Sequence, residues 1–198
     1  MRLLAIDTAT LRPSVALFAD GTDPRTVELP PRAAEALAPA VAALLSGSGV
    51  SPRDLDRVAV VSGPGSFTGL RSSLAFARGL ARAAAALLVP IPTFEAAAAA
   101  RPEPADADLV LDALRGEVHR RRRRAGRLEA AEERLPRGRA LEEAMRDGAE
   151  VLDLDAAALL LAPAAALLAR SAPVGTGDGP TYGRPPAAEE RFGSGEEG

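Results

Sequence analysis

The sequence contains no cysteine and no lysine, and His119 is its single histidine. Without cysteine the chain has no disulfide, no thiolate zinc site, no iron-sulfur cluster and no thiol nucleophile. Because all 24 basic residues are arginine, a P-loop lysine and a Schiff-base lysine are excluded as well. One histidine cannot supply a two-histidine metal motif. The sequence therefore excludes these metal, cofactor and nucleophile sites, and any Ser-His-Asp triad would have to use His119.

Aromatic residues are also scarce, at 3% of the 198 residues, and charge is nearly balanced at a net −3. The core must therefore be built mainly from Ala, Leu and Val, and base-stacking platforms are not expected. The longest apolar stretch, 156–169, contains Pro163 and is too short to cross a bilayer. No segment has the pattern of a signal peptide. The sequence predicts a soluble cytoplasmic protein that contacts no membrane.

The first half of the chain alternates short apolar runs with helical patterns. Apolar spacing and turn residues predict three strands, a helix, a strand, a second helix and a final strand. Their ranges are 3–6, 14–19, 25–29, 33–45, 58–61, 70–88 and 89–93. This order is that of a ribonuclease-H-like lobe, in which helices cover a sheet.

The second half is less regular. Ala96–Ala100 has low complexity, and the segment through Pro104 is interpreted as a linker. We therefore expect an N-terminal lobe (1–95), a smaller C-terminal lobe (96–192) and a disordered tail (193–198). A strand ending in Asp112, a short turn and a returning strand echo the strand that ends in Asp7, which indicates a duplicated lobe. A strand at 151–154 and helices at 139–146 and 156–169 complete the expectation.

A glycine-rich loop lies between the strand at 58–61 and the long helix. It reads GPGSFTGLR and comprises Gly63, Pro64, Gly65, Ser66, Phe67, Thr68, Gly69, Leu70 and Arg71. One interpretation is a cradle for a phosphate or carboxylate, because backbone N–H groups converge at a helix N-terminus and Arg71 offers a countercharge. The alternative is a tight turn whose glycines allow close packing of strand and helix. The glycine spacing matches neither a dinucleotide-binding fingerprint nor a Walker A loop.

Asp7 ends the first strand, where an actin-like or sugar-kinase-like ATPase places an acidic residue beside its nucleotide phosphates and metal. The following residues, Thr8–Leu11, include no glycine, so the backbone could not approach a phosphate closely. We therefore favour a structural aspartate that caps its own turn.

The long helix has more apolar surface than one sheet can cover. Its apolar stripe is a predicted partner interface and comprises Leu70, Leu74, Ala77, Ala81 and Ala84. Small alanine positions let another helix approach closely. The alternative is an internal helix covered by the second lobe.

Five consecutive arginines, Arg120–Arg124, follow His119. Side chains of a strand alternate between its two faces, which favours an exposed ribbon here. One hypothesis is contact with RNA phosphates. The other is a solvated hairpin paired with Glu129, Glu132 and Glu133. His119 is interpreted as a surface residue rather than a ligand or base.

With the opening Leu3–Thr10 (LLAIDTAT), the loop GPGSFTGLR resembles the TsaB (YeaZ) family. Members of that family are inactive paralogues of TsaD in bacterial synthesis of the tRNA modification threonylcarbamoyladenosine. Two further segments are similar to family motifs, namely 112–118 (DALRGEV) and 181–184 (TYGR). The resemblance covers the first half of the chain well and the remainder patchily.

The resemblance implies the two-lobed, actin-like ATPase fold (the ASKHA, ribonuclease-H-like fold) with a reduced second lobe and with nucleotide and metal functions lost. It implies a non-catalytic subunit that binds and activates TsaD in formation of the threonylcarbamoyl group on N6 of adenosine 37, in tRNAs reading codons starting with adenine. The implied partners are TsaD in a heterodimer, and TsaE. A homodimer is implied when TsaD is absent, and tRNA is contacted only through the complex. The family's helices corresponding to 33–45 and 70–88 make the contact with TsaD, so the resemblance adds Leu37, Val41 and Leu44 to the predicted partner interface.

Two segments depart from the family pattern. The family's histidine-serine-glutamate stretch keeps only Glu35, and the strand after Val118, apolar in the family, carries the arginines. The alternative function is an actin-like ATP-binding phosphotransferase that acts on a small molecule through Asp7 and the glycine loop. A peptidase is disfavoured because metal ligands are missing.

Overall fold

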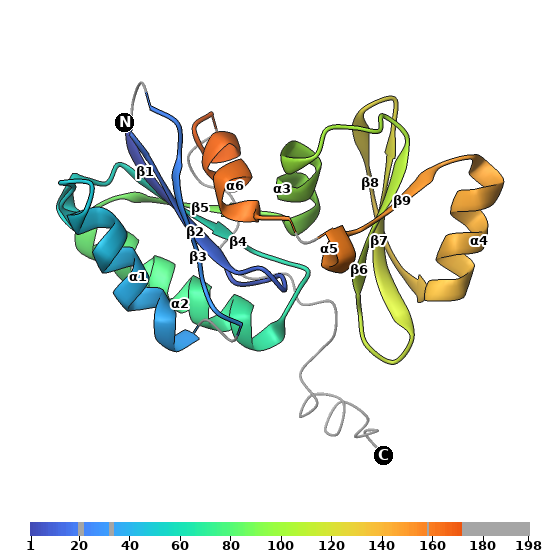
Figure 1. The fold of residues 1–198 in the computed structure, drawn as a ribbon, viewed down its shortest axis with the longest axis horizontal. Helices are drawn as coiled ribbons and strands as arrows, with labels where there is room; N and C mark the ends of the chain where they lie inside the picture. Colours follow the sequence, from blue (N-terminus) through green and yellow to red (C-terminus); the bar gives the residue numbers. More distant parts are fainter. Residues whose placement is uncertain (20–21, 32–33, 158, 172–198) are drawn as a thin grey trace, which may run out of the picture.

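The computed structural model describes residues 1–19, 22–31, 34–157 and 159–171, which form two α/β lobes side by side (Figure 1). The first sheet contains β1 (Arg2–Asp7), β2 (Ser14–Ala19), β3 (Arg25–Glu28), β4 (Arg57–Val61) and β5 (Leu87–Ile91) in the order β3-β2-β1-β4-β5. β1, β2 and β3 pair antiparallel, whereas β4 and β5 continue the sheet parallel to β1. This is the predicted ribonuclease-H-like topology.

Within the described residues, the second sheet repeats the first with one strand fewer. It contains β6 (Ala107–Asp112), β7 (Glu117–Arg124), β8 (Arg127–Pro136) and β9 (Glu150–Asp153) in the order β8-β7-β6-β9. β6, β7 and β8 pair antiparallel, and β9 runs parallel to β6. β6 therefore corresponds to β1, and Asp112 corresponds to Asp7. The duplicated, actin-like two-lobed fold with a reduced second lobe is confirmed.

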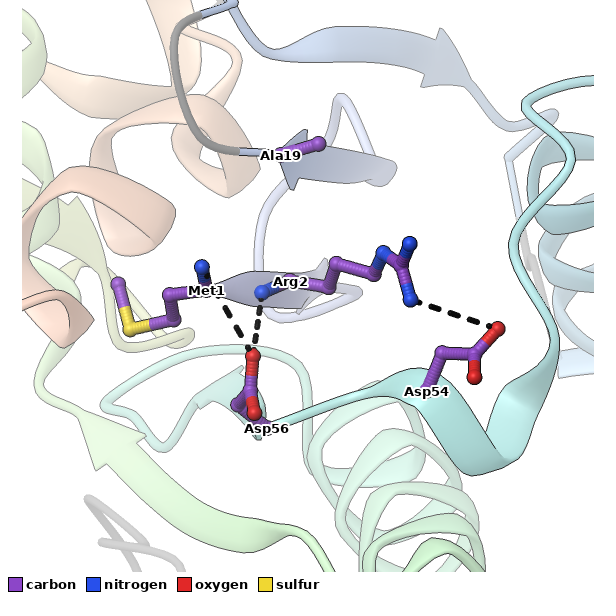
Figure 2. Close-up of a pocket in the computed structure, with 5 residues that line it drawn as sticks. All are labelled: Met1, Arg2, Ala19, Asp54 and Asp56. Atoms are coloured by element: carbon purple, nitrogen blue, oxygen red, sulfur yellow. Dashed lines mark hydrogen bonds and ion pairs between the residues drawn. The ribbon is translucent and has the colours of Figure 1, made fainter.

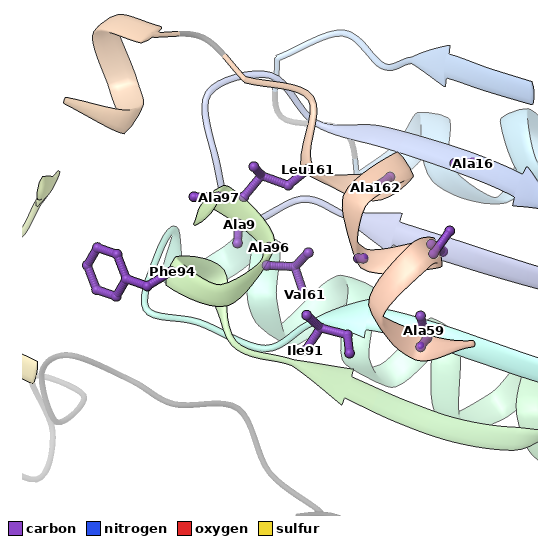
Figure 3. Packing of buried hydrophobic residues seen from close by; sticks show 14 of the residues in the cluster. Ala9, Ala16, Ala59, Val61, Ile91, Phe94, Ala96, Ala97, Leu161 and Ala162 are labelled. Atoms are coloured by element: carbon purple, nitrogen blue, oxygen red, sulfur yellow. The ribbon is translucent and has the colours of Figure 1, made fainter. Parts of the chain in front are cut away.

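Helices cover both faces of the first sheet, which explains why five consecutive residues of β1 are buried. On one face, α1 (Ala34–Ser46) and α2 (Phe67–Ala84) share a core with Leu4 and Ile6. On the other face, α3 (Thr93–Ala100) and α6 (Leu161–Ala169) pack together over alanines of the strands (Figure 3). No helix in the described part of the chain is long and apolar enough to cross a membrane.

The second lobe has one long helix, α4 (Arg137–Asp147), beside its sheet, and a short α5 (Leu154–Ala157) follows β9 (Figure 1). A 3₁₀ turn, η1 (Pro52–Asp54), precedes β4. The core under α3 and α6 extends from Leu3 in β1 to Leu109 in β6 without a break. The Phe94 ring belongs to this core and points away from the first sheet (Figure 3).

Three helical segments differ from the sequence expectation. α2 begins at Phe67 because Ser66 caps it, and it ends at Ala84 because Ala85 adopts a left-handed conformation (φ 53°), so the predicted helix 70–88 extends too far. Residues 96–100, expected as low-complexity linker, belong to α3, since alanine is the best helix former. The predicted helix 156–169 is divided into α5 and α6.

The position of α6 also changes which residues belong to each lobe. α6 follows the second lobe in sequence but packs against β1, β2 and β4 of the first sheet. The first lobe thus includes a segment placed in the second by the boundary expected at 95/96. The predicted tail 193–198 lies outside the described residues.

Candidate functional site

The loop GPGSFTGLR joins β4 to α2 at the carboxyl end of the first sheet. The Ser66 side chain caps α2 by accepting the Gly69 N–H at 3.3 Å. The Ser66 N–H donates to the carbonyl of Ala9 at 2.8 Å, and the Thr93 hydroxyl donates to the carbonyl of Pro64 at 2.6 Å. Two amides that an anion would need at this helix N-terminus are therefore already bonded to the chain itself.

Two glycines of the loop lie against the turn that follows β1. A Cβ on Gly65 would lie 2.4 Å from the Ala9 carbonyl oxygen, and one on Gly69 would lie 1.9 Å from that of Thr8. The Thr8 hydroxyl also donates to the Gly69 carbonyl at 2.7 Å. This contact leaves no room for a phosphate between loop and turn. The geometry supports the tight-turn interpretation of the loop.

Asp7 is fully buried. Its Oδ1 accepts the Ala9 N–H at 2.8 Å, and its Oδ2 accepts the Thr10 hydroxyl at 2.6 Å. Burial raises the pKa of Asp7 to about 6, although these hydrogen bonds oppose the shift. Asp7 thus caps its own turn, as favoured from the sequence.

The predicted partner interface requires a correction. Seven of its eight side chains are at most 7% exposed. Leu70 belongs to the core under α3 and α6, and the other six lie in the core between the sheet and α1 and α2: Leu37, Val41, Leu44, Leu74, Ala77 and Ala81. Ala84 is partly buried against the same core. The first sheet is wide enough to cover both helices, so the apolar stripe faces inward. These residues can shape an interface only by holding the helices in place.

The opposite side of α1 and α2 is exposed and made of small residues. We call the following set the outer face: Ala34, Ala38 and Ala42 on α1, and Ala75, Gly79 and Ala83 on α2. Within each helix these positions are four residues apart, which places them in one row. Arg78 and Arg82 lie beside the row and have no ion pair among the described residues.

Arg120–Arg124 form most of β7. The predicted hairpin with β8 is present, but the arginines are not solvated: Arg120 and Arg123 are each 1% exposed. Arg120 contacts Glu133 and Glu143 and lies 3.4 Å from the buried Asp108. Arg124 pairs with Asp108 and Asp147. Most of these cations are therefore neutralised inside the chain.

Two further expectations at β7 need revision. His119 is 7% exposed rather than on the surface, and its Nδ1 lies 3.3 Å from Glu132 Oε1. Of the predicted partners of the arginine run, Glu133 pairs with Arg120 and Arg122. Glu143 and Asp147 of α4, which sequence reasoning missed, take the place of Glu129 and Glu132. The signal was the four-residue spacing of Glu143 and Asp147, although the predicted helix 139–146 ended one residue before Asp147.

The second family-like segment, 112–118, forms the turn between β6 and β7. Leu114 and Arg115 adopt left-handed conformations (φ 64° and 57°), and Leu114 is 66% exposed. The Asp112 N–H donates to Asp155 Oδ2 at 3.0 Å. The segment 181–184 lies outside the described residues.

A hollow of about 420 Å³ lies at the opposite end of the first sheet, where β1 begins (Figure 2). The Arg2 N–H donates to Asp56 Oδ2 at 2.6 Å, and Arg2 Nη1 lies 3.5 Å from Asp54 Oδ2. The ammonium group of Met1 lies 4.0 Å from Asp56 Oδ2, so each carboxylate has a cation of the chain beside it (Figure 2). The hollow is a junction between β1 and η1. Among the described residues, no cluster of His, Asp and Glu could hold a metal ion.

Comparison with known proteins adds to this geometry. The sequence model of TsaD, tRNA N6-adenosine threonylcarbamoyltransferase, matches residues 28–172. The chain is 45% identical over 94 residues to the tRNA threonylcarbamoyladenosine biosynthesis protein TsaB of Escherichia coli (strain K12). It is 37% identical over 115 residues to the protein of the same description from Haemophilus influenzae. These alignments cover 47% and 58% of this chain but only 41% and 49% of the relatives, so the chain spans about half their length.

Two solved structures are similar over most of the chain. YeaZ from Pseudomonas aeruginosa matches with a TM-score of 0.62 and 30% identity, covering 70% of this chain and 68% of that chain. An uncharacterized protein with similarity to peptidase YEAZ from Pseudomonas aeruginosa matches with a TM-score of 0.61 and 31% identity, covering 68% and 66%. The chain belongs to the TsaB (YeaZ) family, within the wider family that the TsaD sequence model describes.

Proposed function

We propose that this chain is a non-catalytic subunit in the synthesis of threonylcarbamoyladenosine in tRNA, and that it binds and activates a TsaD-type partner through the outer face of α1 and α2. TsaE joins this pair, and tRNA is contacted only through the complex, in the cytoplasm. When the TsaD-type partner is absent, the same face pairs two copies of this chain.

The observation that carries the proposal is Gly79. It lies in the interior of α2, is exposed, and has nothing within 4 Å of where its Cβ would be. A glycine in a helix interior costs about 1 kcal/mol relative to alanine, and no contact within the chain requires it. A partner helix that crosses α2 closely does require a small residue there. The neighbouring arginines favour a partner helix that carries carboxylates.

The closed glycine loop supports the proposal that this chain has no catalytic role. Asp7 is bonded to its own turn, and the glycines that could have opened a phosphate site are packed against Thr8 and Ala9. The continuous core under α3 and α6 occupies the space between the lobes. These contacts support a role in binding rather than in phosphoryl transfer.

Co-purification with the TsaD-type partner tests the interface. Gly79→Glu is expected to abolish retention of the partner and to leave the isolated chain folded, because the new side chain points into open space. Gly138→Glu on α4 is the matched control, since a Cβ there also meets nothing within 4 Å. It is expected to retain the partner fully.

Light scattering on the isolated chain tests the same face of α1 and α2 by a second measurement, its oligomeric state. Gly79→Glu is expected to give a monomer where the parent chain gives a dimer. Undiminished partner retention by Gly79→Glu contradicts the interface, whereas micromolar ATP binding that is lost in Asp7→Asn contradicts the non-catalytic role.

A further inference from the structure

Two arginines of β7 reach toward the first lobe, in the direction opposite to the arginines that contact α4. Arg121 Nη1 lies 3.4 Å from Glu95 Oε1, which belongs to α3. Arg123 Nη1 donates to the carbonyl of Arg101 at 2.6 Å, and its Nη2 donates to the carbonyl of Pro104. The alternation of side chains along β7 thus separates two sets of contacts.

Both acceptors of Arg123 lie where the chain passes between the lobes. Arg101 ends α3, and its N–H still donates to the carbonyl of Ala97 at 3.0 Å. Because α3 packs against α6 over the first sheet, the Arg101 carbonyl is fixed to the first lobe. Pro104 lies in the segment 101–106 that connects α3 to β6. Arg123 therefore joins β7 of the second lobe to the end of a first-lobe helix.

The turn between β7 and β8 holds the same connecting segment. The Ala125 N–H donates to Asp106 Oδ1 at 2.6 Å, and the Gly126 N–H donates to the carbonyl of Ala105 at 2.9 Å. Donors of the second lobe thus bind these acceptors of the connecting segment. Backbone rotation at 101–106 would have to break these bonds together.

The burial of Arg123 indicates that this residue fixes the relative position of two segments rather than adding stability. Arg123 is 1% exposed and pairs with no carboxylate in the part of the chain that the structure describes. Burial lowers its pKa, although the charges of Glu103 and Glu150 oppose the shift, because removing a guanidinium from water is costly. An apolar side chain would fill the space more cheaply. What the guanidinium adds is a rigid fork that holds two carbonyls in a fixed relative position.

We propose that Arg121 and Arg123, together the interlobe clamp, hold the two lobes of this chain at one angle. In two-lobed proteins that close on a ligand, a few connecting residues absorb the rotation. Here Arg123 occupies the carbonyls of Arg101 and Pro104 in the connecting segment, and Arg121 contacts α3. The outer face of α1 and α2 and the second lobe are thereby presented as one rigid body. This inference does not depend on the identity of the partner.

A distance measurement between the lobes tests the clamp. The chain has no cysteine, so Thr26→Cys on β3 and Met145→Cys on α4, both exposed, give two unique spin-label sites. The labelled chain is diluted in excess unlabelled chain, so that distances between two copies do not contribute. Electron-electron double resonance is then expected to give one narrow distance in the parent chain. Arg123→Met is expected to broaden it, Arg123→Lys to broaden it less, and the exposed Arg127→Met to leave it unchanged.

Hydrogen exchange distinguishes loss of the clamp from a local effect. Exchange at the amides of Ala125 and Gly126 is expected to rise about tenfold in Arg123→Met, the factor that corresponds to about 1.4 kcal/mol. Faster exchange with an unchanged narrow distance shows that Arg123 stabilises only the turn, and this result overturns the proposal.

A second variant keeps the test decisive if Arg123→Met does not fold. Arg121→Gln with Glu95→Gln removes the ion pair, in which Arg121 is 16% and Glu95 44% exposed, and leaves Arg123 in place. A broader interlobe distance in this double variant supports the clamp. A distance as narrow as that of the parent chain overturns it.

Discussion

Gly69 of α2 lies directly against Thr8 of the first turn: the Thr8 hydroxyl donates to the Gly69 carbonyl at 2.7 Å, and a Cβ on Gly69 would lie 1.9 Å from the Thr8 carbonyl oxygen. The obstacle is backbone, which cannot rotate away as a side chain can. The position therefore admits glycine alone. This contact is the reason why the loop packs closed on the turn.

Gly69→Ala is accordingly expected to destabilise the chain by about 1–3 kcal/mol, the usual cost of forcing an extra methyl group into a packed region. Gly79→Ala in the same helix is the matched control, because its Cβ meets nothing within 4 Å. It is expected to stabilise the isolated chain by up to about 1 kcal/mol. Urea unfolding of both variants measures the difference. Equal effects at the two positions would contradict the close approach of loop and turn.

The stability of the chain is expected to fall as pH rises through the range in which Asp7 titrates. Its pKa is raised from an ordinary 3.8 to about 6 in the folded state. Below 3.8 the carboxyl is protonated in both states, and between these values only the unfolded state ionises. The loss over this range is about 3 kcal/mol, since one pKa unit corresponds to about 1.36 kcal/mol.

Asp7→Asn removes this dependence. The amide oxygen can accept the Ala9 N–H, and the amide nitrogen can donate to the Thr10 hydroxyl, so both contacts of the turn are kept. The variant is expected to be more stable than the parent at pH 7.5 and to differ little at pH 3.5. Denaturant unfolding at the two pH values measures this, with Asp7→Ala, which loses both bonds, as the control. A variant less stable than the parent at pH 7.5 would show that the ionised carboxylate is needed in the folded state.

The strands of the first lobe could be predicted because the sheet is buried on both faces. Helices on each side leave β1 and β4 as continuous apolar runs, which the sequence displays directly. The order of elements and the echo between Asp7 and Asp112 followed from the same runs. The end of α2 could not be predicted, because Ala85 is as favourable in a helix as its neighbours, yet it adopts a left-handed conformation and β5 begins at Leu87.

The partner interface and the environment of the arginines depend on tertiary packing. An apolar stripe that includes Leu74 and Ala81 predicts burial but does not show which surface covers the stripe. Here the chain's own first sheet covers it. Likewise, a run of arginines predicts a solvated ribbon unless a later helix returns with carboxylates. Glu143 lies 23 positions after Arg120 in the sequence, yet the two side chains are 2.7 Å apart.

Glu143 is expected to make the second lobe sensitive to acid. Its carboxylate accepts hydrogen bonds from Arg139 and Arg120, which lower its pKa from 4.5 to about 2, and it also lies 2.9 Å from Arg122. A lowered folded pKa stabilises the fold above pH 4.5, and the contribution is lost as pH falls toward 2. Because the apolar core between the second sheet and α4 is small, the ion pairs contribute much of the stability that holds α4 against the sheet.

Glu143→Gln is therefore expected to lower the melting temperature at pH 7 and to flatten the decline in stability between pH 4.5 and 2. The amide still fills the space but leaves Arg120, which is 1% exposed, with less compensation. Glu142→Gln, at the exposed neighbouring position, is the control and is expected to retain the parent's acid profile. Hydrogen exchange in β7 and α4 locates the effect, which should be absent from β1 and β4. If both glutamine variants follow the parent's acid profile, the carboxylate of Glu143 is not what holds α4 against the arginines, and packing of Ala140 and Ala144 against the sheet must suffice.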